Sequence, residues 1–174
     1  MICGLLYVGF AVENVDASWR ALHRLFGLPG ESLPPDPFLG TDKGARLVFP
    51  NECWLYVMES RQTESSVCQF IDKRGPGLER VAFLSDDIEA EFWRARHAGV
   101  PLSDAALVDT PSGRRFFVPG SFVSGVGVEV IQPKPGAWDF AAPDNISGVL
   151  GLQHIGVAVR DTDAACDAFA RLFA

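Results

Sequence analysis

The sequence predicts an α+β fold that is built from a repeated module. Three segments, which begin at Tyr7, Arg80 and His154, open with a run of β-branched and small apolar residues, continue with an acidic or Asn turn, and lead into a helical stretch. Their starting points lie 73 and 74 residues apart, and self-similarity at a fixed spacing indicates a repeated structural unit. We therefore expect each repeat to begin with a strand that is followed by a helix.

In the first repeat, the turn predicts the start of a helix at Asn14, whose side-chain oxygen can accept a hydrogen bond from a free N–H of the first helical turn. Apolar residues follow at helical spacing, which predicts one apolar face made of Trp19, Leu22, Leu25 and Phe26. Two short apolar runs, 45–49 and 53–58, predict strands after this helix.

The second repeat has the same order of elements. Asp87 occupies the N-cap position, as Asp161 does in the third repeat, Phe92 and Ala95 lie on the apolar face, and Gly99 predicts the end of the helix. Further strands are expected at 115–118 and 127–131. Each module is thus one strand, one helix and two or three more strands. We predict four parts: a first module (1–72), a second module (73–133), a linker (134–151) and the start of a third, incomplete module (152–174).

The charge and cysteine content exclude several classes of protein. The chain carries 15 Lys and Arg against 22 Asp and Glu, which gives a formal net charge of −7. This balance argues against binding to nucleic acid or to a membrane surface, and no apolar run approaches the ~18 residues of a membrane span. The four cysteines are scattered and form no C-x-x-C pair, which is typical of reduced thiols, so we expect a cytoplasmic protein.

Two motifs resemble those of a known superfamily. The segment Phe70–Phe83 carries a Gly-Pro-Gly-Leu sequence before an apolar run, and His154–Val159 opens the third repeat. With the repeated module, they resemble the vicinal oxygen chelate superfamily: glyoxalase I, methylmalonyl-CoA epimerase, extradiol dioxygenases and bleomycin-resistance proteins. The resemblance is strongest to the epimerase branch. It implies paired βαβββ modules that form facing half-barrels around a cleft, with a divalent metal held by the first and last strands of each module.

By this resemblance, the four metal-ligand positions are Tyr7 and Tyr56 in the first module and Arg80 and Glu129 in the second, each pair being 49 residues apart. Only Glu129 is a side chain that a divalent ion binds readily. A guanidinium stays protonated and repels a cation, and tyrosine is a poor ligand unless it is ionised. We therefore expect no metal in this module pair and no other cofactor, and a divalent metal only if the chain is an active metalloenzyme.

The same positions supply the candidate site residues. Glu129 is the candidate catalytic residue, as a metal ligand or as a base. The candidate ligand-binding residues line the cleft that the resemblance implies, where aromatic walls and a few polar groups hold a small molecule. They are Tyr7, Trp54, Tyr56 and Arg80.

A charge pair is expected within this set. A buried carboxylate is tolerated mainly when it is paired, so we predict that Arg80 and Glu129 form a salt bridge, directly or through one water. We interpret Arg114 and Arg115, which lie in a hairpin region, as a solvated charge pair; the alternative is that they bind the phosphates of a coenzyme-A-type substrate.

His154 occupies a ligand position of the third module, but the last strand of that module would lie beyond residue 174. In two-domain members of the superfamily, the N-terminal module pair often lacks the metal that the C-terminal pair holds. A truncated gene, a longer protein that has been cut, and a βα unit exchanged within a homodimer all remain open. We expect residues 152–174 to be poorly ordered or docked on a neighbouring chain, because their strand has no module to pair with.

Three functions are compatible with these features. The first is a metal-dependent epimerase, lyase or dioxygenase that acts on a bidentate oxygen substrate. The second is a metal-free module that binds a small molecule, as bleomycin-resistance proteins do. The third is a non-catalytic pair that supports a catalytic half. The altered ligand positions favour a superfamily member of metalloenzyme ancestry that has lost the metal site and binds a small molecule or supports a catalytic half.

Overall fold

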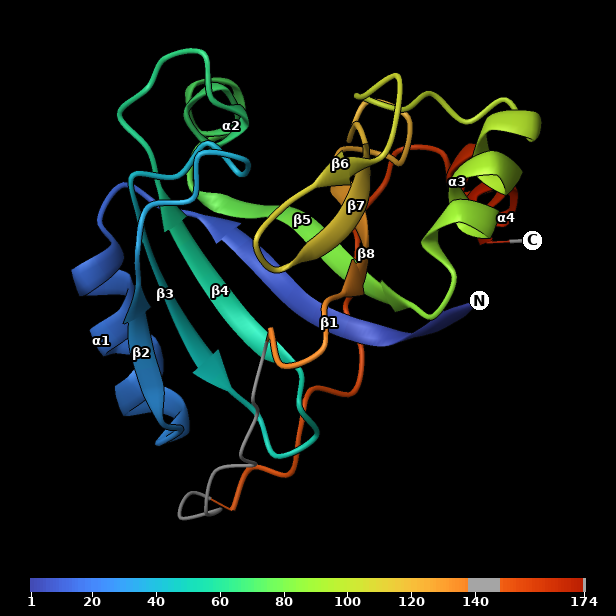
Figure 1. Cartoon of the computed structure of the whole chain (residues 1–174). Helices are drawn as coiled ribbons and strands as arrows, with labels where there is room; N and C mark the ends of the chain where they lie inside the picture. Colours follow the sequence, from blue (N-terminus) through green and yellow to red (C-terminus); the bar gives the residue numbers. More distant parts are fainter. Residues whose placement is uncertain (138–147, 174) are drawn as a thin grey trace. The chain divides into compact units, whose positions relative to one another are not determined.

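The computed structural model describes residues 1–137 and 148–173 (Figure 1). Its elements follow in the order β1 (Ile2–Ala11), α1 (Val15–Phe26), β2 (Gly30–Leu33), β3 (Lys43–Val48), β4 (Trp54–Glu59), α2 (Ser66–Arg74), β5 (Gly77–Ser85), α3 (Ile88–His97), β6 (Val108–Asp109), β7 (Gly113–Val118), β8 (Gly127–Pro133) and α4 (Thr162–Phe173). Within the described residues, no helix is long and apolar enough to cross a bilayer. The order β1-α1-β2-β3-β4 recurs as β5-α3-β6-β7-β8, which confirms the α+β class and the two βαβββ modules.

The described residues group into two compact units. The first unit contains Tyr7–Glu79 and residues 148–153, and the second contains Met1–Leu6, residues 80–137 and residues 154–173. Strand β1 therefore contributes residues to both units. Helix α2 spans the predicted module boundary between residues 72 and 73, and most of the predicted linker, 134–151, lies outside the described residues.

In the first unit, the strand order is β2-β3-β4-β1. Strands β1 and β4 are parallel, whereas β3 is antiparallel to both β2 and β4. Helix α1 covers one face of this sheet, where Trp19 and Leu22 pack against a core that includes Ala45 and Val57. The prediction of one apolar helix face is wrong for Leu25, which is 71% exposed. Fewer positions of this helix face the sheet than its apolar pattern predicts.

In the second unit, the strand order β5-β8-β7-β6 repeats the pattern of the first. Strands β5 and β8 are parallel, and β7 is antiparallel to both β8 and β6. The predicted apolar residues of α3, Phe92 and Ala95, are buried, and the Phe92 ring lies 5.8 Å from that of Phe116 in β7.

The three predicted N-caps are all present. In each, a side-chain oxygen accepts a hydrogen bond from the backbone N–H three residues on, which satisfies one free donor of the first helical turn. The distances are 2.8 Å at Asn14, 3.0 Å at Asp87 and 2.9 Å at Asp161. A local sequence signal was sufficient at these positions because the interaction itself is local.

The helix of the third repeat is present as α4 and lies beside α3 of the same chain (Figure 1). Leu172 in α4 is fully buried, and the Phe173 ring lies 4.9 Å from that of Phe83 in β5. The expectation of a disordered or intermolecularly docked segment is wrong for this helix, because α3 of its own chain covers its apolar face. Residues 152–159 form no strand, and His154 is exposed.

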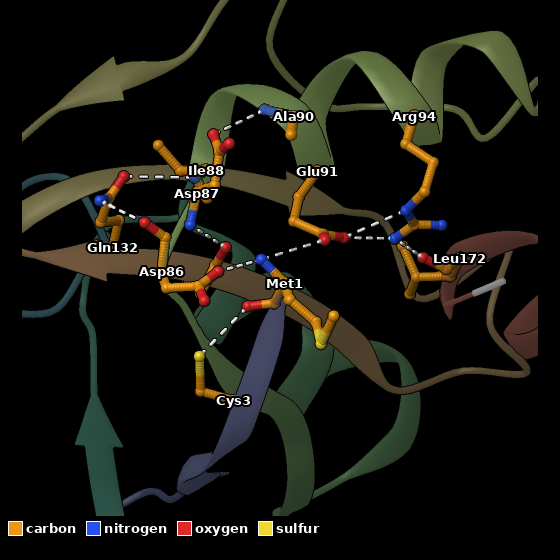
Figure 2. A network of polar contacts seen from close by, with 11 residues as sticks. Met1, Cys3, Asp86, Asp87, Ile88, Ala90, Glu91, Arg94, Gln132 and Leu172 are labelled. Carbon is orange, nitrogen blue, oxygen red and sulfur yellow. Dashed lines mark hydrogen bonds and ion pairs between the residues drawn. The ribbon is translucent and has the colours of Figure 1, made fainter.

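Polar contacts reinforce this helix pair (Figure 2). Arg94 in α3 donates hydrogen bonds to the Glu91 carboxylate and to the backbone carbonyl of Leu172. The amino group of Met1 forms an ion pair with Asp86 nearby. Arg94 thus places a positive charge at the C-terminal end of α4, where the helix dipole favours a cation.

Candidate functional site

Three of the predicted residues lie together on one sheet face of the first unit. Side chains alternate along a strand, so that Trp54 and Tyr56 point away from the α1 face, which holds Val57. Tyr7 is the register partner of Trp54. The rings of Tyr7 and Trp54 are stacked at 5.6 Å, and the rings of Tyr7 and Tyr56 meet edge to face, also at 5.6 Å. This aromatic cluster is buried.

Arg46 belongs to the same face, and the sequence reasoning missed it. Its guanidinium carbon lies 5.4 Å from the centroid of the Trp54 ring, and its guanidinium also pairs with Glu31 of β2. The alternation of side chains along β3 indicates which residues share a face with Arg46. Only the pairing of β3 with β2 and β4 shows that this is the face of the aromatic cluster. The first unit therefore presents aromatic rings with one guanidinium stacked on them.

A buried ion pair lies on the corresponding face of the second unit. Nη1 of Arg115 donates a hydrogen bond of 2.8 Å to Oε1 of Glu129, and these side chains are 8% and 2% exposed. The prediction that Arg114 and Arg115 are a solvated pair is wrong for Arg115. Strand alternation turns these two residues to opposite faces, so that Arg114 reaches the exposed Glu89 at 2.6 Å instead.

Arg80 lies on the same face as this ion pair. It is 3% exposed, and its guanidinium carbon lies 5.2 Å from the centroid of the Phe117 ring. A Cβ added to Gly127, the register partner of Arg80, would come within 2.3 Å of Phe117 Cζ, so the absence of a side chain there makes room for the ring. The predicted bridge between Arg80 and Glu129 stays a prediction, and the structure adds Arg115 as a direct partner of the carboxylate.

Of the four side chains at the ligand positions, one is of a type that a divalent metal binds readily. Tyr7 and Tyr56 belong to the first unit, and Arg80 and Glu129 belong to the second. Only Glu129 offers an anionic oxygen of the kind that such ions prefer, and its carboxylate is hydrogen-bonded to a guanidinium. In residues 1–137 and 148–173, no three His, Cys, Asp or Glu side chains are grouped so that they could hold a metal ion.

A separate polar depression in the first unit contains none of the predicted residues. It is lined by Asp42, Lys43, Glu59, Arg61 and Gln62. Hydrogen bonds from the backbone N–H of Arg61 and the side chain of Gln62 lower the pKa of Asp42 below its usual value. Because its charged groups pair with one another and with helix α1, we regard this depression as a structural network.

Comparisons with known proteins identify the fold. No protein-family model matches the chain, and no curated protein is significantly similar to it. Among solved structures, methylmalonyl-CoA epimerase from Mycobacterium tuberculosis is 28% identical, with a TM-score of 0.70 over 77% of this chain and 90% of that chain.

Two further structures agree with this result. Methylmalonyl-CoA epimerase from Streptomyces coelicolor, in complex with 2-nitronate-propionyl-CoA, is 19% identical, with a TM-score of 0.67 over 76% of this chain and 99% of that chain. A hypothetical protein from Bacillus halodurans C-125 is 24% identical, with a TM-score of 0.67 over 75% of this chain and 94% of that chain. With its two βαβββ modules, the chain thus has the fold of the vicinal oxygen chelate superfamily, and the resemblance to the methylmalonyl-CoA epimerase branch is confirmed.

Proposed function

We propose that this chain is a metal-free member of the superfamily that binds a small molecule. The observation that carries the proposal is the ion pair between Arg115 and Glu129, at 2.8 Å and with both side chains buried. Glu129 is the one carboxylate at the four ligand positions, and Arg115 already neutralises its charge, which weakens its attraction for a cation.

Acyl thioesters are the first ligand class to test. The Streptomyces coelicolor relative is described as a complex with an acyl-CoA analogue, and the aromatic cluster of Tyr7, Trp54 and Tyr56 offers apolar surface of the kind that lines small-molecule sites. A role in supporting a catalytic half elsewhere is compatible with the same binding activity. In either role, side chains of this chain bind the ligand without a metal ion.

Elemental analysis and calorimetry test this proposal together. The purified chain should contain far less than one Zn, Co, Ni, Mn or Fe per molecule, and its affinity for propionyl-CoA should be the same with and without EDTA. About one metal per chain that is lost in Glu129→Ala would overturn the metal-free assignment, as would thioester binding that requires an added divalent ion.

The similarity to epimerases favours one alternative, a metal-dependent epimerase. This alternative predicts exchange of the C2 hydrogen of methylmalonyl-CoA for deuterium in D₂O when Co²⁺ or Mn²⁺ is added, and no exchange in Glu129→Gln. The metal-free proposal predicts no exchange above background in either protein.

A further inference from the structure

We propose that residues 154–159 are an interaction surface that pairs, as a β-strand, with the same residues of a second copy of this chain. The proposal goes beyond the proposed function and depends on neither a ligand nor a metal. Three observations carry it: the sequence of the segment, the state of its backbone, and the pairing that the opening strands of the first two repeats already make.

The segment has the sequence of a strand. His154-Ile-Gly-Val-Ala-Val repeats the pattern found in β1 from Tyr7 and in β5 from Arg80. Its β-branched residues alternate with small ones, which is typical of a strand with one buried face. The burial has the same period, because exposed residues alternate with three half-buried ones, Ile155, Val157 and Val159.

The backbone of the segment is available for pairing. Within residues 1–137 and 148–173, residues 154–160 belong to no strand, and no hydrogen bond joins their backbone to another part of the chain. A Cβ added to Gly156 would meet no other described atom within 4 Å, so the exposed side of the segment is open. A row of exposed N–H and C=O groups on a strand-forming sequence is a template for another strand.

Helix α4 holds one end of the segment in place. Asp161, which caps this helix, follows the segment after one residue. The helix itself is docked on the second unit through the buried Leu172 and through Phe173, whose ring lies 4.9 Å from that of Phe83. The C-terminal end of the segment is therefore ordered before a second copy arrives, which reduces the entropy cost of pairing.

The first two repeats indicate the partner. Strands β1 and β5 are neighbours in the sheet, and in the second unit the N–H of Asp86 donates a hydrogen bond of 3.2 Å to the carbonyl of Met1. Opening strands of this pattern thus pair with each other. Because β4 lies on the other side of β1, and β8 on the other side of β5, neither strand has an edge left. The next opening strand of this kind is that of a second copy.

The ends of the sheet fit the segment less well. They are β2 and β6, which have four and two residues. Two copies of the segment, in contrast, match in length and have a two-fold symmetric arrangement. In an antiparallel pair centred on Val157, Ile155 lies opposite Val159 of the second copy, so the apolar side chains share one face. An interface of this size is well below the roughly 1,200 Å² of stable complexes, so we expect a weak dimer.

Sedimentation velocity of the full chain over a range of concentrations tests the proposal. We expect a dimer that dissociates on dilution. Successive N–H groups of a strand point to opposite edges, so Gly156→Pro and Val157→Pro each remove the donor of one edge. At least one of these variants should weaken the dimer at least tenfold. Leu25→Ser is the control for nonspecific apolar association, because Leu25 is 71% exposed on α1, and it should dimerise as the unmodified chain does.

Hydrogen exchange locates the contact. The amide protons of residues 154–159 should exchange rapidly in dilute protein, and at least tenfold more slowly at a concentration where the dimer dominates. If circular dichroism shows that both proline variants are unfolded, this comparison on the unmodified chain decides.

Three results would overturn the proposal. They are a chain that stays monomeric at the highest concentration, a dimer that neither folded proline variant weakens, and exchange in residues 154–159 that does not change with concentration. None of these results bears on the metal content or the thioester binding of the chain, so a failure here is distinguishable from a failure of the proposed function.

Discussion

Replacement of Arg115 by methionine tests the buried ion pair directly. The change keeps much of the aliphatic bulk of the side chain but removes the donor that lies 2.8 Å from Glu129 Oε1. The Glu129 side chain is 2% exposed, so water cannot readily replace the lost donor. Removing one partner of a buried pair costs about 3–5 kcal/mol, and we expect the free energy of unfolding to fall by this amount. At about 2–4 °C per kcal/mol for a chain of this size, Tm should fall by roughly 6–20 °C.

Urea unfolding with linear extrapolation measures this effect. The double variant Arg115→Met with Glu129→Gln should recover part of the loss, because it removes the charge that the single variant leaves buried. Arg114→Met is the matched control on the neighbouring residue. Its ion pair with Glu89 is largely exposed, at 39% and 64%, so the stability of this variant should be nearly unchanged. If Arg115→Met loses no more stability than Arg114→Met, the buried ion pair contributes no more to folding than the exposed one.

Three further changes should have measurable effects. Gly127→Ala should destabilise the chain by about 1–3 kcal/mol in urea unfolding, because the added Cβ would come within 2.3 Å of the Phe117 ring; a neutral result would contradict the close packing. Leu172→Ala should speed amide hydrogen exchange across α4, because its side chain is 0% exposed; unchanged protection would mean that other contacts hold the helix. Burial raises the pKa of Cys53 to about 11, so at pH 8 it should react with a disulfide reagent far more slowly than the exposed Cys166, and equal rates would show that its thiol is accessible.

The sequence alone was sufficient to predict the features that depend on residues close together in the chain. The N-caps at Asn14, Asp87 and Asp161 join atoms only three residues apart, and the repeated order of strand and helix follows from local hydrophobic patterns. The spacing of 49 residues between first-strand and last-strand positions also placed Tyr7 with Tyr56 and Arg80 with Glu129 on matching strand pairs.

Short elements with weak local patterns were not predicted. Strand β2 is exposed along most of its four residues, and β6 has only two residues. Helix α2 buries only Val67. Such elements form because neighbouring strands and caps stabilise them. They contain too few apolar positions to give a recognisable period in the sequence.

Only the tertiary structure decided which side chains share a face and which partners they meet. Arg114 and Arg115 are adjacent in sequence, yet one reaches the surface carboxylate of Glu89 and the other the buried carboxylate of Glu129. The pairing of β7 with β8 sets this outcome, and a shift of one residue in that register would exchange the two faces. The docking of α4 on α3 was likewise set by contacts between residues far apart in the chain. Local sequence patterns reflect interactions between groups that are close together in the chain. The partner of a buried charge depends instead on which distant strands are brought together when the apolar core is buried.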